Sequence, residues 1–263
     1  MKIFALSILL ILFFSLHTGP IQNTLPCTPK QTETIPLEAL QLIKVYPQNI
    51  LAYKNGYLFF SDSSKILFDD GIKNKSAEEL LKNPDVEDMF HYRYKTGNLF
   101  IPAFNEDPGR IRNELFFKKI YGSSAADVKK KCVFINWLSK TKKQKILFST
   151  VGNAHLQLQK ISDELEILPD TLKKFLFPLG GTFNFRKIAG TERASAHSYG
   201  IAIDLNTNFA NYWRWQQKPN QKLNYMNKFP QQIINIFEKH GFIWGGRWYH
   251  YDTMHFEYRP ELF

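Results

Sequence analysis

Three side chains with metal-binding donor atoms stand in the last third of the 263-residue sequence. His197 and Asp204 lie in the segment S-A-H-S-Y-G-I-A-I-D-L-N at 195–206, and His255 lies in D-T-M-H-F-E at 252–257. Two imidazole nitrogens and one carboxylate oxygen form a donor set that Zn²⁺ binds tetrahedrally, with a fourth position left for water. The sequence therefore predicts a catalytic zinc site at these three residues, and this site would support hydrolysis.

The spacing around these residues resembles that of a known peptidase family. The pattern S-x-H-x-x-G-x-A-x-D runs from Ser195 to Asp204, and D-x-x-H-F follows from Asp252. This combination is similar to that of the zinc D-alanyl-D-alanine carboxypeptidases and related peptidoglycan peptidases (VanY-type, the M15 family). These share the small α+β fold of hedgehog signalling domains and lysostaphin-like enzymes. The resemblance covers residues 150–263, and no motif of this family is found before them.

The resemblance implies roles for residues around the predicted ligands. Asp252 would be the general base that takes a proton from the attacking water and delivers it to the leaving amine. Many members carry Glu there, so the shorter Asp252 must approach the water more closely. Arg186 would contact the substrate, because a guanidinium can hold a terminal carboxylate or polarise the scissile carbonyl, and Arg193, nearer to His197, is the alternative. Ser195 could hydrogen-bond the substrate, orient His197 or be an ordinary loop hydroxyl.

The hydrophobic pattern predicts the elements that position these side chains. Apolar residues recur at spacings of three and four over 151–168 and again over 229–240, which predicts two amphipathic helices. Residues 200–206 alternate as a strand does, with Asp204 away from the apolar face, and a last strand is expected at 254–258. We therefore expect an α+β fold, in which an antiparallel sheet bears the zinc on one face and helices cover the other.

The first half of the chain carries no motif that indicates chemistry. Between residues 37 and 149 short strand-like runs alternate with turn signals. Asn55-Gly56 predicts a hairpin, and Ser76 followed by Glu79 predicts a short capped helix. The sequence thus divides into an N-terminal region of unknown role (37–149) and a zinc peptidase domain (150–263).

The start of the chain has the features of a secretory signal peptide. One positive charge precedes an apolar run at 3–16, which is shorter than the about 20 residues that a membrane span needs. We expect a signal peptide at 1–19, a flexible lead at 20–36, and an exported protein, periplasmic or extracellular, with no stable membrane span after cleavage. In such a compartment Cys27 and Cys132 could form a disulfide or stay free.

The net charge of the chain favours some classes of binding partner over others. The formal net charge is +10 and falls to +9 once Lys2 leaves with the signal. A basic exported chain suits carboxylate-rich peptidoglycan, whereas its lysines are too scattered for a nucleic-acid groove. We therefore expect a zinc-dependent peptidase acting on peptidoglycan stem peptides, a D-alanyl-D-alanine carboxypeptidase in cell-wall remodelling. The alternatives are an endopeptidase that cuts at a D/L junction and a non-catalytic module that binds cell wall or a partner through the same fold.

Overall fold

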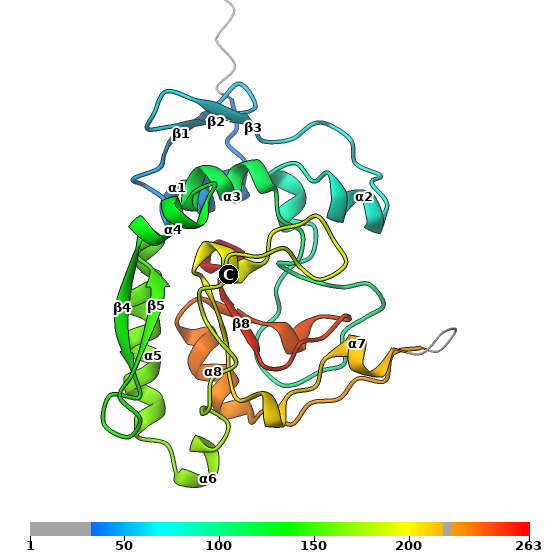
Figure 1. Ribbon diagram of the computed structural model, residues 1–263. Helices are drawn as coiled ribbons and strands as arrows, with labels where there is room; N and C mark the ends of the chain where they lie inside the picture. The colour runs from blue at the N-terminus through cyan, green and yellow to red at the C-terminus, as the bar shows by residue number, and fades with distance from the viewer. Residues whose placement is uncertain (1–32, 218–221) are drawn as a thin grey trace, which may run out of the picture. The chain divides into compact units, whose positions relative to one another are not determined.

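Short helices and strands alternate along residues 33–217 and 222–263, the part of the chain that the computed structural model describes (Figure 1). The strands are β1 (Ile50–Lys54), β2 (Tyr57–Phe60), β3 (Lys65–Leu67), β4 (Cys132–Trp137), β5 (Gln144–Ser149), β6 (Ala202–Asp204), β7 (Phe242–Trp244) and β8 (His255–Tyr258). The helices are α1 (Leu37–Val45), α2 (Ala77–Lys82), α3 (Glu114–Tyr121), α4 (Ala125–Lys130), α5 (Ala154–Glu166), α6 (Asp170–Lys173), α7 (Trp213–Gln216) and α8 (Gln231–Lys239). The strands form small antiparallel sheets, so the α+β prediction is confirmed.

The sheet that carries the predicted ligands has the strand order β6-β8-β7. Its register pairs Asp204 with His255 and Ala202 with Glu257, so these four residues lie on one face. Phe256 points to the opposite face and stacks on a phenylalanine ring of α8 at 4.0 Å between centroids. The two predicted strands are therefore confirmed, although β6 has only three residues.

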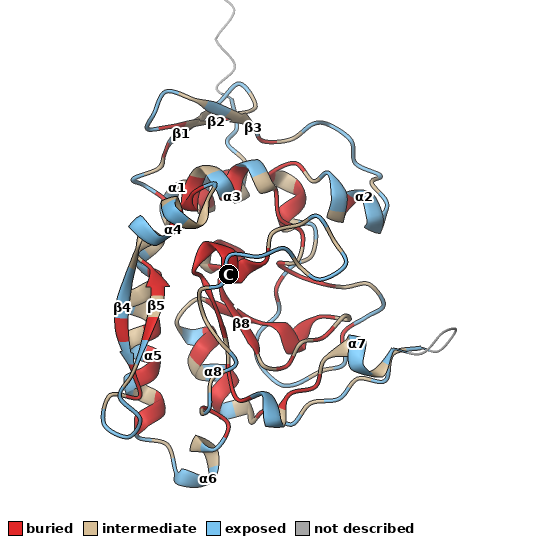
Figure 2. Cartoon of the chain, viewed as in Figure 1, coloured by how far each residue is buried: buried red, intermediate tan, exposed pale blue. Residues whose placement is uncertain are grey.

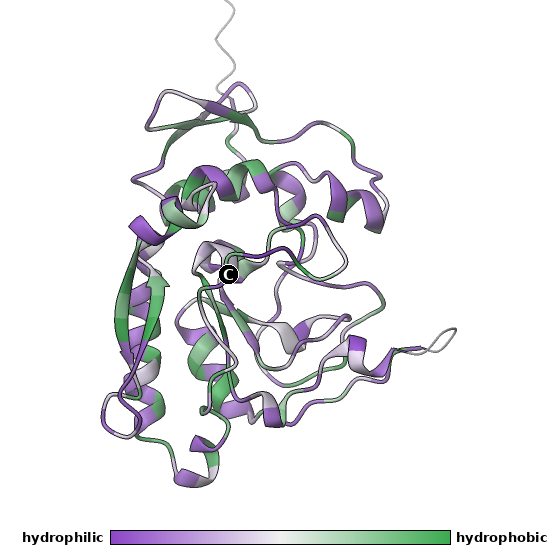
Figure 3. Cartoon of the chain, in the orientation of Figure 1, coloured by the Kyte–Doolittle hydropathy of each residue, from purple (hydrophilic) through white to green (hydrophobic). Residues whose placement is uncertain are grey.

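The two predicted amphipathic helices are present as α5 and α8, and each begins later and ends earlier than predicted. α5 begins at Ala154 because Gly152 and Asn153 before it adopt positive φ values of 58° and 63°. α8 is followed by Gly241 at φ 78°, the left-handed residue that commonly ends a helix. Hydrophobic and hydrophilic residues both occur on α8 (Figure 3), and its buried side packs against β7. The apolar residues on that side are Ile233, Ile234 and Phe237.

The structure corrects the expectation of mainly short strands over residues 37–149. Helices α1, α3 and α4 lie in this range. The Asn113 side chain caps α3 by accepting a hydrogen bond from the Phe116 backbone N–H at 2.8 Å. The apolar run that follows places one side of α3 in the core: Phe116, Phe117, Ile120 and Tyr121. These residues form two adjacent apolar pairs, and the pairs are four positions apart, which is the spacing of a buried helix face. The prediction of strands overlooked this helical spacing.

Two local predictions for this region are confirmed. Asn55 and Gly56, with φ values of 50° and 77°, form the turn between β1 and β2. The Ser76 hydroxyl accepts a hydrogen bond from the Glu79 backbone N–H, and the Glu79 carboxylate accepts one from the Ser76 N–H, so α2 begins with the predicted capping box.

One hydrophobic core joins both sides of the boundary that was predicted at 149/150. Residues Glu33–Phe263 form one compact unit, and their main core cluster contains Leu42 and Phe117 from one side and Leu158 and Phe237 from the other. Figure 2 shows buried residues along β8 and on the inner sides of α5 and α8. The boundary therefore separates the part of the sequence with the peptidase motif from the part without it, and the hydrophobic core is continuous across it.

Several predictions for the start of the chain concern residues outside those that the structure describes. The predicted signal peptide at 1–19, the lead up to residue 32 and Cys27 lie outside the described residues. Cys132 is half-buried on β4, and its pairing with Cys27 stays a prediction. None of the helices in the described ranges is long and apolar enough to cross a membrane.

Candidate functional site

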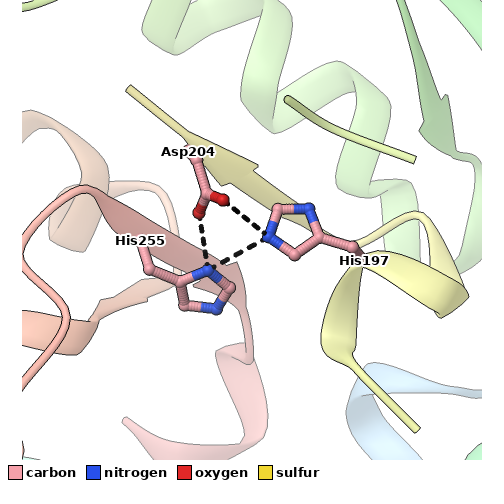
Figure 4. Close-up of side chains that lie close together, drawn as sticks. All are labelled: His197, Asp204 and His255. Carbon is pink, nitrogen blue, oxygen red and sulfur yellow. Dashed lines mark hydrogen bonds and ion pairs between the residues drawn. The ribbon is translucent and has the colours of Figure 1, made fainter. Parts of the chain in front are cut away.

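The three predicted metal ligands converge at one edge of the β6-β8-β7 sheet (Figure 4). Asp204 ends β6, His255 begins β8, and His197 lies on the short helical turn η3 (Ala196–Tyr199). The Asp204 Oδ2 atom is 3.2 Å from His197 Nε2, and its Oδ1 atom is 2.8 Å from His255 Nδ1. The two imidazole nitrogens are 3.2 Å apart. The structure thus brings together three donor atoms from segments far apart in the sequence.

The turn η3 holds His197 against β6. Ser195 precedes the turn, and its hydroxyl accepts a hydrogen bond from the His197 backbone N–H at 3.4 Å. The Ser195 N–H donates to the Arg186 carbonyl at 3.0 Å. Gly200 ends the turn at φ 66°, where an added Cβ would also lie 2.9 Å from the Cys132 Sγ atom. Glycine at this position therefore allows the chain to turn directly from the first ligand into β6.

Each of the two histidines has one ring nitrogen beside an outer acceptor, and its other ring nitrogen faces Asp204. His197 Nδ1 lies 2.5 Å from the Thr182 carbonyl, which can only accept, so this nitrogen carries the proton. His255 Nε2 lies 3.0 Å from the Glu257 Oε1 atom and donates to it. The remaining nitrogens, His197 Nε2 and His255 Nδ1, then face each other and the Asp204 carboxylate. Two imidazole nitrogens and a carboxylate that converge in this way form a donor set that fits Zn²⁺.

The electrostatic environment favours a positive charge among these residues. Burial lowers the pKa of His255, but Asp204 and Glu257 outweigh it and raise that pKa to about 10. Burial raises the pKa of Glu257, yet Arg112 and His255 bring it down to about 2. Burial also raises the pKa of Asp204, but His197 and His255 outweigh it and lower that pKa, so both carboxylates are ionised at neutral pH. The field that stabilises a proton on His255 would also stabilise a divalent cation.

Asp252 provides an unpartnered carboxylate beside the three ligands. Its Oδ1 atom is buried and has no hydrogen-bond partner among the described residues. Burial and the negative charge of Asp204 raise the pKa of Asp252 to about 7. The Asp252 backbone is held by a bridge to Tyr212 and by a hydrogen bond from its N–H to the Gly245 carbonyl at 3.0 Å. A carboxylate with a free oxygen and a pKa near neutrality can exchange protons with a substrate.

A cavity of about 270 Å³ opens over the metal-ligand group. Arg186, Ser195 and Asp252 line it together with the three predicted ligands. A second cavity, of about 260 Å³, lies against Gly180–Asn184 and shares Arg186, His197 and Asp204 with the first. Arg186 therefore lies where the two cavities meet, beside two of the predicted ligands.

Arg193, the alternative to Arg186, lines neither of these cavities. Its guanidinium donates a hydrogen bond to the Arg110 backbone carbonyl. Arg110 and Arg112 themselves line the larger cavity, although they come from the region for which the sequence indicated no role. Arg112 donates to Glu257 Oε1 at 3.2 Å and so supports the hydrogen-bond partner of His255. The only signal for these two residues is the segment D-P-G-R-I-R at 107–112, in which a turn is followed by two alternating arginines.

A second group of carboxylates, Asp69, Asp85 and Glu87, also has ligand atoms within 4.8 Å of one another. Lysine ammonium groups already occupy this region. Lys75 Nζ lies 3.1 Å from Asp85, and Lys73 Nζ lies 2.5 Å from Asp69. The group is therefore neutralised by ion pairs and lacks the convergent imidazole lone pairs of the first site.

Comparison with known proteins bears on the same part of the chain. Residues 189–258 match a family model described as D-alanyl-D-alanine carboxypeptidase. The matched segment includes His197, Asp204, Asp252 and His255, and ends before the chain terminus. Comparisons with the curated proteins and with the solved structures gave no match. The resemblance predicted from the spaced motif is confirmed for residues 189–258, whose match to this model supports an M15 family peptidase.

Proposed function

We propose that this protein is a zinc-dependent metallopeptidase that hydrolyses peptidoglycan stem peptides, as a D-alanyl-D-alanine carboxypeptidase. The observation that carries the proposal is the convergence of His197, Asp204 and His255 beside the unpartnered Asp252. The family match over the same segment supports the reaction class. The specific fold that we propose for this domain is that of the hedgehog and D-alanyl-D-alanine peptidase domains.

The proposed roles follow from the positions of the side chains. Zn²⁺ bound by His197, Asp204 and His255 would supply Lewis-acid polarisation of the scissile carbonyl and activation of a water. Asp252 accepts a proton from the water that adds to the carbonyl carbon, and passes it to the leaving nitrogen as the C–N bond breaks. The buried and unpartnered Oδ1 atom of Asp252, in the cavity beside the three predicted ligands, suits both transfers. Arg186 lies beside the ligands and contacts the substrate near the reacting carbonyl.

We also propose that the protein is exported and acts in the periplasm or outside the cell. The positive charge followed by an apolar run at 3–16 supports this location. The net charge of +9 that remains after Lys2 leaves with the signal would favour approach to a wall rich in carboxylates.

The test is digestion of purified muropeptides by the zinc-loaded mature protein, followed by mass spectrometry. Release of one D-alanine from pentapeptides, with about one zinc per chain by metal analysis, is the expected result. Asp252→Asn should retain zinc and lose about 10²- to 10⁴-fold in rate, the range of one general base. His155→Gln, which changes a histidine of α5 outside the site, is the matched control and should keep both properties.

The same digestion separates the alternatives. Cleavage inside the stem peptide without D-alanine release would favour the endopeptidase. Intact muropeptides that still bind to the zinc-loaded protein would favour the non-catalytic module. Absence of both cleavage and binding would contradict the proposal.

A further inference from the structure

Arg110 brings a guanidinium into the larger cavity from outside the segment that matches the peptidase family. It lies on the cavity wall together with Trp248 and His250. Its side chain is 17% exposed, so it is largely enclosed and still reachable. The family match begins at residue 189, and it therefore assigns nothing to this arginine.

The backbone around Arg110 is fixed by a tight turn. The Arg110 N–H donates to the Asp107 carbonyl at 3.1 Å, and the Arg110 carbonyl accepts from Arg193. Gly109 has φ 87°, and a Cβ there would lie 2.3 Å from the Ile243 Cδ1 atom, so only glycine allows this approach to the sheet. The Gly109 carbonyl also accepts a hydrogen bond from Arg259 at 2.9 Å. This turn anchors Arg110 to the sheet that carries the metal ligands.

The Arg110 side chain is held in place by one acid and one aromatic ring. Its Nη1 atom lies 3.1 Å from the Asp107 Oδ2 atom, and its Cζ atom lies 5.7 Å from the centre of the Trp248 ring. Asp107 also accepts hydrogen bonds from the His250 N–H at 2.9 Å and from His250 Nδ1 at 2.6 Å. The guanidinium is therefore pre-positioned, and less side-chain entropy is lost when it binds a ligand.

Arg110 keeps donors that the protein does not use. Among the described residues only Asp107 accepts from its guanidinium, which has five N–H groups. Arg112, two residues on, is already committed to Glu257 and to the Ala194 carbonyl. A positioned guanidinium with unused donors in a cavity matches the planar, bidentate geometry of a carboxylate.

Arg110 and Arg186 occupy different positions relative to the two cavities. Arg186 lies where they meet, against His197 and Asp204, whereas Arg110 lines only the larger cavity, on the side of Trp248 and His250. We propose that Arg110 binds the terminal carboxylate of the leaving amino acid, an inference that rests on the proposed peptidase function. Arg186 is then left to the scissile carbonyl. The substrate class that follows is a peptide with a free carboxyl end, whose last residue occupies the larger cavity and whose preceding residues run into the smaller one.

The test compares a stem pentapeptide that has a free terminal carboxylate with the same peptide carrying a terminal amide. Wild-type protein, Arg110→Met, Arg110→Lys and the surface control Arg93→Met are assayed with both, all zinc-loaded. Arg93 is exposed and outside the cavity, and its replacement changes the net charge equally. Wild-type protein should prefer the acid by about 10- to 100-fold in kcat/KM, the range of one charge-assisted hydrogen bond. Arg110→Met should lose that preference mainly through KM, Arg110→Lys should keep part of it, and Arg93→Met should keep all of it.

Equilibrium binding supplies a readout that does not depend on turnover. Each Arg110 variant is combined with Asp252→Asn, and binding of the acid and of the amide is followed by calorimetry. The acid should bind about 10- to 100-fold more tightly than the amide only when Arg110 is present. Equal losses for acid and amide in Arg110→Met would mean that Arg110 only shapes the cavity, and would overturn the inference. Hydrolysis of both peptides by wild-type protein without preference would also overturn it while leaving the peptidase function intact. If no variant hydrolyses either peptide, the proposed function fails and the binding comparison alone decides the role of Arg110.

Discussion

Asp204 and His255 are direct partners across the antiparallel strands β6 and β8, and their side chains meet at 2.8 Å between Oδ1 and Nδ1. Successive side chains of a strand point to opposite faces, so a slip of one residue would move one ligand away from the other. The sheet register is therefore what brings together two of the three predicted ligands. His197 joins them from η3, whose end at Gly200 leads directly into β6.

Replacing Asp204 with asparagine should weaken zinc binding without unfolding the chain. Asparagine has nearly the same shape but no charge, and its amide group would face two imidazole lone pairs. We expect the zinc affinity to fall by more than about 100-fold, beyond the loss caused by removing an outer partner of a ligand. Competition with a chromophoric chelator measures this. Asp170→Asn, whose side chain is 96% exposed, is the control. An unchanged affinity in Asp204→Asn would remove Asp204 from the ligand set.

Glu257→Gln should reduce zinc affinity by about 10- to 100-fold, because Glu257 orients the His255 ring and supports its basicity. The variant should also destabilise the fold by about 3 to 5 kcal/mol, since Arg112 would lose its buried anionic partner. Glu261→Gln separates the two effects. Glu261 is equally buried and pairs with Arg259, but it does not contact a predicted ligand.

Urea unfolding and chelator competition are measured on both of these glutamate variants. Glu261→Gln should lose stability while its folded form binds zinc normally. If both variants lost zinc affinity to the same extent, the effect of Glu257 would be one of general stability, and its assigned role would be wrong.

The sequence contains the chemistry of the site more completely than its surroundings. The residue types and spacing of His197, Asp204 and His255 predict the ligand set, and strand alternation places Asp204 and its partner on one face. The ligand set and the shared strand face both follow from local patterns, and such patterns can be read from a single sequence. The same is true of the Asn55-Gly56 turn and of the apolar stripe on α8.

The wall of the cavity could not be predicted in this way. Arg112 contacts Glu257 across 145 residues of sequence, and the contact depends on how α3 and the turn before it pack against the sheet. No local period records such a pairing. Arg193 was a reasonable candidate because of its closeness to His197 along the chain, but its side chain turns to the Arg110 carbonyl. Proximity in sequence is a weak guide to direction once the backbone enters a loop.

Gly245→Ala should lower the turnover number by about 10- to 100-fold, the cost of a small misplacement of a reacting group. A Cβ at Gly245 would lie 2.4 Å from the Asp252 carbonyl oxygen, so the Asp252 backbone would have to move. The predicted metal ligands are not touched, and zinc affinity should stay within about twofold. Gly71→Ala is the control for backbone strain outside the site, because φ is 80° there and a Cβ meets open space, so turnover should be unchanged. A variant with normal turnover would show that the position of Asp252 tolerates displacement, which argues against its role as the base.

Asp107→Asn should destabilise the protein in a manner that depends on pH. Burial raises the pKa of Asp107, but the hydrogen bond from His250 and the charge of Arg110 outweigh it, so the folded-state pKa lies below the ordinary value. A group with a depressed folded pKa contributes stability that is present above its unfolded pKa of about 3.9. That contribution is lost as the pH falls through the lower folded value. Asparagine cannot supply it at any pH.

Urea unfolding at several pH values tests this coupling. At pH 7 Asp107→Asn should be less stable than wild type by about 1.5 to 3 kcal/mol, the range of hydrogen bonds to charged groups. The difference should stay constant down to about pH 4 and then shrink as Asp107 of the wild type takes up a proton. Asp163→Asn, on the exposed side of α5, should differ from wild type by less than about 0.5 kcal/mol at each pH. A deficit of Asp107→Asn that persists unchanged at pH 3 would mean that the charge of Asp107 does not stabilise the turn that carries Arg110.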